Sequence, residues 1–106
     1  MIRPAKFTKK VSVKQKTVDS FVRDLGRSPT VIKVEAEGYE PEILRGATNT
    51  LAECGPVLLI DAGPERRGQS TIKMCKEILI KFDYNFEILP DGKRMMAFPI
   101  SYKYRA

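Results

Sequence analysis

Residues 31–61 read VIKVEAEGYEPEILRGATNTLAECGPVLLID and decide the fold class of this 106-residue chain. The first six residues, VIKVEA, alternate between two faces and predict a strand. Residues 57–60 are apolar on both faces, which is typical of a central parallel strand covered by helices on both sides. Between the strands, Pro41 predicts the start of a short helix that Gly46 ends, and a second helix is expected from about Thr48 to Cys54. This order predicts parallel strands joined by a right-handed crossover.

The segments on both sides extend this unit. Upstream, Thr17 can cap a helix whose apolar residues recur at helical spacing until Gly26, with Asp19 in the first turn complementing the helix dipole. Downstream, a longer helix is expected over Ser70–Phe82. Two further strands are expected at Phe86–Leu89 and Arg94–Phe98, and the turn sequence between them predicts an antiparallel hairpin. We therefore expect one α/β unit with parallel strands, helical crossovers and a C-terminal antiparallel hairpin.

The net charge of +6 is unevenly distributed. Residues 1–16 hold six basic residues and no acidic ones, whereas the remaining 13 basic residues balance the 13 acidic ones. We divide the chain into a basic N-terminal arm, residues 1–16, and the α/β unit, residues 17–106. A solvated arm is the simpler interpretation, because Phe7 alone offers a ring for base stacking there. Contact with nucleic acid or an anionic membrane is less favoured.

Composition excludes several classes of function. The chain has no histidine, which excludes a Ser-His-Asp triad and a His-ligated zinc, and we expect no metal site. No apolar run approaches the roughly 20 residues of a membrane span, and no secretory signal is present at the start. Cys54 and Cys75 lack the CxxC spacing and are expected to be small apolar residues in a reducing compartment, so we expect a cytoplasmic protein.

Carboxylates gather where the first expected strand ends. Glu35, Glu37 and Glu40 lie within six residues, and Asp61 ends the next strand. Ligands bind outside the carboxyl ends of strands in open α/β sheets, and a carboxylate in a partly dry cleft can accept a proton from a hydroxyl. A structural interpretation is also open: Lys33 can neutralise Glu35, and Glu40 can complement a helix N-terminus.

Several motifs in fixed order resemble the FkbM family of methyltransferases. Val18-Asp19 matches its helix-opening dipeptide, and Leu44-Arg45-Gly46-Ala47 matches its L-x-G-A segment. The family's proline, followed by an apolar strand that ends in an acid, corresponds to residues 56–61. The family's central acidic block is matched by five residues: Ile32, Lys33, Glu37, Gly38 and Glu40. The resemblance is close over residues 17–63, and the remainder agrees in the order of its elements.

This resemblance implies a partial Rossmann-like, class I methyltransferase sheet, whose fourth strand is residues 31–36, whose fifth is residues 57–61, and whose sixth and seventh form the hairpin. It implies S-adenosylmethionine as cofactor and O-methyl transfer to a hydroxyl of a small molecule or sugar. The catalytic candidates are Glu35, Glu37 and Asp61. Four residues are expected next to substrate or cofactor: Lys33, Gly38, Tyr39 and Glu40.

The sequence departs from the family pattern in two ways. Glu35 stands where the family has aspartate and Asp61 where it has glutamate, and each exchange shifts a carboxylate by about one methylene. In addition, the seven glycines form no G-x-G, and sixteen residues before the first helix are too few for three βα units. We therefore expect the C-terminal half of a catalytic domain, binding S-adenosylmethionine weakly or not at all alone.

Two other hypotheses remain. In a half-domain the 31–36 strand becomes a sheet edge with unpaired backbone groups, which predicts a non-catalytic interaction or dimerisation module. Its partner would be a second copy of the chain or a complementary N-terminal half. Nucleic-acid binding through the arm is the least favoured hypothesis.

Overall fold

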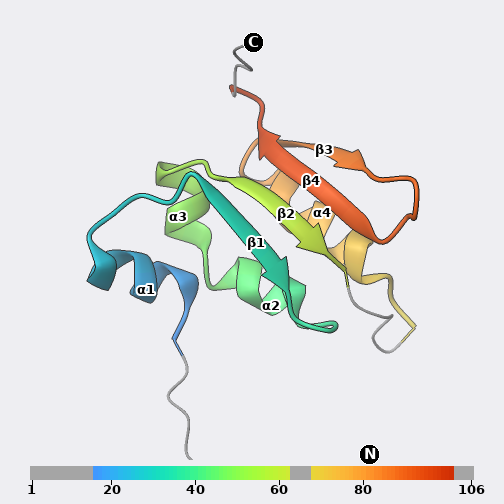
Figure 1. The fold of residues 1–106 in the computed structure, drawn as a ribbon, viewed down its shortest axis with the longest axis horizontal. Coiled ribbons are helices and arrows are strands. Elements are labelled where there is room, and N and C mark those ends of the chain that lie inside the picture. The colour runs from blue at the N-terminus through green and yellow to red at the C-terminus, as the bar shows by residue number, and fades with distance from the viewer. Residues whose placement is uncertain (1–15, 63–67, 102–106) are drawn as a thin grey trace, which may run out of the picture.

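The computed structural model describes residues 16–62 and 68–101, so most of the basic arm lies outside the described residues. Within these ranges the predicted mixed α/β architecture is confirmed (Figure 1). The elements follow in the order α1 (Val18–Leu25), β1 (Val31–Glu35), α2 (Glu40–Arg45), α3 (Thr48–Glu53), β2 (Val57–Asp61), α4 (Thr71–Ile80), β3 (Tyr84–Ile88) and β4 (Arg94–Pro99).

The four strands form one sheet in the order β1-β2-β4-β3. β1 and β2 are parallel, with Val31 opposite Val57 and Glu35 opposite Asp61. β4 is antiparallel to both β2 and β3, so the expected C-terminal hairpin is present and its second strand lies beside β2. The crossover between β1 and β2 contains the two short helices that Pro41 and Gly46 predict.

Helices α2, α3 and α4 cover one face of the sheet, whereas α1 lies beyond the edge of β1, and Figure 1 views the sheet from its other face. Alternate strand residues enter the core beneath the helices, where Leu58, Ile60 and Met95 are almost fully buried. The residue between two of them, Leu59, is 42% exposed. The expectation that residues 57–60 are covered on both faces is therefore not met within the described residues. We call the uncovered side the open face.

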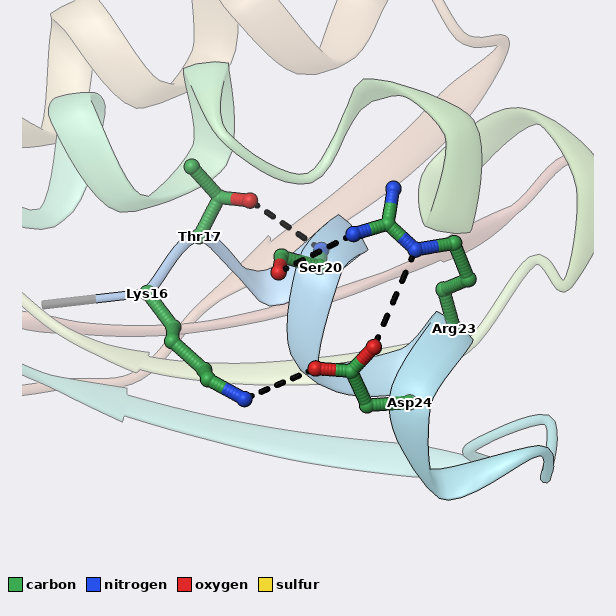
Figure 2. Close-up of polar contacts among 5 residues, drawn as sticks. All are labelled: Lys16, Thr17, Ser20, Arg23 and Asp24. Carbon is green, nitrogen blue, oxygen red and sulfur yellow. Dashed lines mark hydrogen bonds and ion pairs between the residues drawn. The ribbon is translucent and has the colours of Figure 1, made fainter.

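Local hydrogen bonds set the ends of α1 as its sequence predicts. Thr17 Oγ1 accepts a bond from the Ser20 N–H at 3.1 Å, and Gly26 ends the helix with a left-handed φ of 70°. Figure 2 shows this cap together with the ion pair of 2.7 Å between Lys16 and Asp24. The apolar stripe of the helix has no buried residue, however. α1 is thus well formed but only loosely covered.

Asp19 links α1 to α3. Its carboxylate accepts hydrogen bonds from the N–H groups of Asn49 and Thr50, at 3.0 and 2.8 Å, and from the Thr50 hydroxyl at 2.7 Å. Partial burial by itself raises the pKa of Asp19, but the bonds from Asn49 and Thr50 outweigh that effect and the pKa is lowered. Asp19 lies in the first turn of α1, as expected, yet its hydrogen bonds serve the N-terminus of α3.

We expect Asp19→Asn to lower the free energy of unfolding at pH 7 by about 1–2 kcal/mol, because an amide replaces the charged acceptor at an N-terminus. Since the folded-state pKa is depressed, this stabilisation is present above the unfolded-state pKa and is lost as the pH falls through the folded-state value. Urea unfolding at pH 7 and near pH 2 measures both effects. The exposed Asp24→Asn is the control, and an equal loss in both variants would contradict the prediction.

The side chain of Tyr84 joins the start of β3 to the residue that precedes β2. Its hydroxyl donates to the carbonyl of Pro56 at 2.6 Å in the interior. Burial raises the pKa of Tyr84 to about 12. The phenol therefore stays protonated in the folded chain at a pH where it ionises in the unfolded chain.

Tyr84→Phe is expected to lower the free energy of unfolding at pH 7 by about 1–2 kcal/mol, because it leaves the buried Pro56 carbonyl without its donor. Between pH 10 and about 12 the stability of the wild-type chain should fall as the unfolded phenol loses its proton, while the variant lacks this slope. Unfolding monitored by circular dichroism across that range tests it. A wild-type slope that persists in the variant would refute the assignment.

Candidate active site on the open face

Two of the predicted catalytic carboxylates lie side by side. Glu35 and Asp61 are register partners at the carboxyl ends of the parallel strands β1 and β2. Register partners project to the same face, which for this pair is the open face. Lys33 projects to that face two residues earlier, opposite Leu59. The structure therefore brings together Lys33, Glu35 and Asp61 at the edge where open α/β sheets bind ligands.

A hollow of about 450 Å³ lies on the open face and is lined by Lys33 and Asp61 but not by Glu35. Leu59, Leu89 and Met96 form its apolar part, and Lys33, Asp61 and Arg94 contribute charged groups. Arg94 stands opposite Asp61 across the β2–β4 pairing. A carboxylate here can accept a hydrogen bond or a proton from a hydroxyl, while the two cations can balance negative charge.

Arg94 is held in place by the hairpin turn. Its Nε donates to Asp91 Oδ2 at 2.7 Å. This bond with Asp91, and more weakly the charge of Asp61, raises the pKa of Arg94. In return, the bonds that Asp91 receives from the Lys93 N–H and from Arg94 lower the pKa of Asp91 to about 2. The hairpin thus places a permanent cation near the end of β2.

The turn after β1 is organised by Glu40. This side chain is 0% exposed, and its carboxylate accepts bonds from the N–H groups of Ala36 at 2.6 Å and Gly38 at 2.9 Å. Gly38 has a φ of 101°, a conformation that side chains disfavour, so the turn requires a glycine there. Glu40 therefore shapes the backbone next to the site.

The other two predicted site residues of this turn point to solvent. Glu37 is exposed and follows β1 with a φ of 48°, and Tyr39 is exposed at the start of α2. Because β1 ends at Glu35, Glu37 lies in the turn beyond the register pair of Glu35 and Asp61. Glu35 is also exposed and Asp61 half-buried, so the described residues form an open site instead of the partly dry cleft expected from the sequence.

Sequence reasoning missed the contribution of the hairpin to this site. Arg94, Met96 and Leu89 enter the hollow because β4 inserts between β2 and β3. The sequence signal was the turn at residues 90–92, which predicts the hairpin but not which of its strands pairs with β2. Within the described part of the chain, no three Asp, Glu or Cys side chains gather as metal ligands.

A family model for the methyltransferase FkbM domain matches residues 2–105. The chain belongs to this family. The match covers nearly the whole chain and agrees with the motifs at residues 18–61, and methyl transfer is the general activity that the family description states. No curated protein and no solved structure matches the chain. In the described parts of this FkbM domain, no helix has the length and apolar character needed to cross a bilayer.

Proposed function

We propose that this FkbM domain takes part in S-adenosylmethionine-dependent O-methyl transfer to a hydroxyl of a small molecule or sugar, in the cytoplasm. One observation carries the proposal: in a chain of this family, Glu35 and Asp61 are paired at the carboxyl ends of two parallel strands. In this proposal β1 and β2 correspond to the fourth and fifth strands of a Rossmann-like methyltransferase sheet, and the hairpin to the sixth and seventh.

The residues of the open face fit such a reaction. S-adenosylmethionine, when bound, supplies a methyl group on a cationic sulfonium, which neighbouring carboxylates attract. Glu35 or Asp61 accepts the proton that the substrate hydroxyl loses as its oxygen takes the methyl group. Lys33 projects to the same face two residues before Glu35, so its ammonium group can attract negative charge at the site. In the turn after β1, Gly38 allows close backbone approach, and Glu40 holds that backbone in place. Glu37 and Tyr39, which are exposed in the same turn, are the residues proposed to contact substrate or cofactor from there.

The cofactor loop of the family has no counterpart in these 106 residues, because none of their seven glycines forms a G-x-G. We therefore propose that the present residues supply the C-terminal half of the catalytic site. A strand–loop–helix segment with the glycine motif, encoded upstream in the same or a neighbouring reading frame, would supply the remainder. The 106 residues alone should bind S-adenosylmethionine weakly or not at all.

Two measurements test this proposal. Calorimetric titration of the 106-residue chain with S-adenosylmethionine should show no binding in the micromolar range. Co-expression with the upstream segment should restore transfer of a labelled methyl group, and Glu35→Gln or Asp61→Asn should then lower turnover by about 100-fold. Glu87→Gln, an exposed carboxylate on β3, is the control. Full turnover with both site carboxylates neutralised would disprove the mechanism.

A second candidate function is a non-catalytic interaction or dimerisation module. The outer edge of β1 favours it, because no strand of the described ranges pairs there. The partner would be a second copy or a complementary N-terminal half. Analytical ultracentrifugation at high concentration tests self-association, and a monomer throughout would count against the homodimer.

A further inference from the structure

Two opposite charges stand side by side at the end of β2, and no ion pair joins them in the described chain. Asp61 and Arg94 are register partners on the antiparallel strands β2 and β4, and both line the hollow on the open face. The recorded ion pair of Arg94 is with Asp91 in the hairpin turn, at 2.7 Å. This turn lies beside the end of β2 in Figure 1. The guanidinium is therefore held apart from the carboxylate that is a candidate base.

The hairpin turn fixes Asp91, and Asp91 orients Arg94. Oδ1 of Asp91 accepts bonds from the N–H groups of Lys93 at 2.9 Å and Arg94 at 3.1 Å, while Oδ2 accepts from Arg94 Nε at 2.7 Å. A guanidinium carries five N–H donors. Among the described residues only its Nε has a recorded bond, which leaves the two terminal nitrogens for a ligand. Such a fork binds the two oxygens of a carboxylate together.

The hollow next to these charges is lined mainly by apolar side chains, among them Leu59, Leu89 and Met96. Lys33 adds a second cation, and no ion pair is recorded for it in the part of the chain that the structure describes. A volume of about 450 Å³ lies in the range of small-molecule sites. The hollow therefore favours a ligand with an apolar body, one negative group and one hydroxyl.

We propose that the methyl acceptor is a hydroxy acid with an apolar body, whose carboxylate binds Arg94 and whose hydroxyl donates to Asp61. The terminal nitrogens of Arg94 hold the carboxylate, and the apolar body lies against Leu59 and Met96. Arg94 then selects an acidic acceptor over a neutral sugar, and Asp91 is the positioning residue that orients it. This inference rests on the proposed function for the fate of the hydroxyl, but binding of the acid requires no cofactor.

This site is compatible with an N-terminal half that completes the sheet. β4 pairs with β2 on the side away from β1. Strands added beside β1 extend the sheet in the other direction. The pairing of Asp61 with Arg94 and the hairpin turn therefore keep their places.

Titration of the 106-residue chain with 4-hydroxybenzoate, followed by heteronuclear NMR, tests binding without a cofactor. The backbone signals of Asp61, Arg94 and Met96 should shift. Neutral 4-hydroxybenzamide should bind about tenfold more weakly, because it lacks the charge of the carboxylate. Added salt should weaken the acid and not the amide. Equal affinity for the two probes, or shifts confined to other parts of the chain, would overturn the proposal.

Variants assign this preference to the guanidinium. Arg94→Met should weaken 4-hydroxybenzoate about tenfold and leave the amide unchanged. Arg45→Met is the matched control, because the Arg45 side chain is 55% exposed against 58% for Arg94 and also pairs with a carboxylate three residues earlier, that of Glu42. Binding of the acid that survives Arg94→Met, or that falls equally in the control, would overturn the assignment.

Asp91→Asn tests the positioning role. The amide oxygen of asparagine can still accept the N–H bonds of the turn, but the charge that holds the guanidinium is gone. The variant should therefore weaken 4-hydroxybenzoate and leave 4-hydroxybenzamide unchanged. A merely structural role would weaken both probes alike, and that result would overturn the positioning role.

Transfer assays separate this inference from the proposed function. In the complex with the upstream segment, Arg94→Met should raise KM for 4-hydroxybenzoate about tenfold with little change in kcat, because Arg94 binds the acceptor and does not react. Equally efficient methylation of the acid and the amide would overturn the acidic acceptor and leave methyl transfer intact. Arg94-dependent binding of the acid by a complex that methylates neither probe would support the carboxylate site and count against the proposed function.

Discussion

Glu40→Ala is expected to lower the free energy of unfolding by about 3 kcal/mol, because it removes two hydrogen bonds and leaves the buried Gly38 N–H and the part-buried Ala36 N–H without this acceptor. The buried carboxylate is the acceptor for Ala36 and Gly38 at 2.6 and 2.9 Å. Without it the turn after β1 loses its fixed shape. Urea unfolding followed by circular dichroism measures the loss.

Two further variants assign this loss to the turn. Glu40→Gln keeps one acceptor oxygen but turns an amide NH₂ toward an N–H group, so an intermediate loss is expected. Glu77→Ala makes the same substitution at an exposed position of α4, where the change should stay within about 0.5 kcal/mol. If Glu40→Ala were as mild as Glu77→Ala, the carboxylate would not be what holds the turn.

Leu79→Ala should lower the free energy of unfolding by about 3 kcal/mol, since it removes a side chain that fills the core between α4 and the sheet. Leu79 is 0% exposed and belongs to the same cluster as Leu58 and Met95. The neighbouring Ile80 is 62% exposed, so Ile80→Ala should change stability by less than about 1 kcal/mol. Thermal and urea unfolding of the pair give the comparison, and similar losses at both positions would mean that α4 packs by a different face.

The helices and strands could be predicted because local signals define them. Thr17 and Ser70 each accept a bond from an N–H group three residues later, and Gly26 takes a left-handed φ. These interactions span a few residues, so their residue types are visible as short patterns. β1 ends one residue earlier than predicted, at Glu35, and α2 begins one residue before Pro41.

The site could be predicted only in part, for a related reason. The sequence predicted that Glu35 and Asp61 lie together, because the carboxyl ends of neighbouring parallel strands meet at the same edge of a sheet. The place of Arg94 depended on which hairpin strand pairs with β2, and the bonds of Asp19 join residues 30 and 31 apart. No local pattern encodes such distant partners.

By itself the sequence determined the α/β class and the order of helices and strands, because the spacing of apolar residues, the helix caps and the turn residues act within a few positions along the chain. It also determined the family, through motifs that follow one another in a fixed order. Tertiary structure alone decided which face of the sheet is covered, that Glu40 is buried within the turn, and that an apolar groove follows the edge of β1 where no described strand pairs. These features depend on how the elements pack against one another, and packing joins residues that no sequence window contains together.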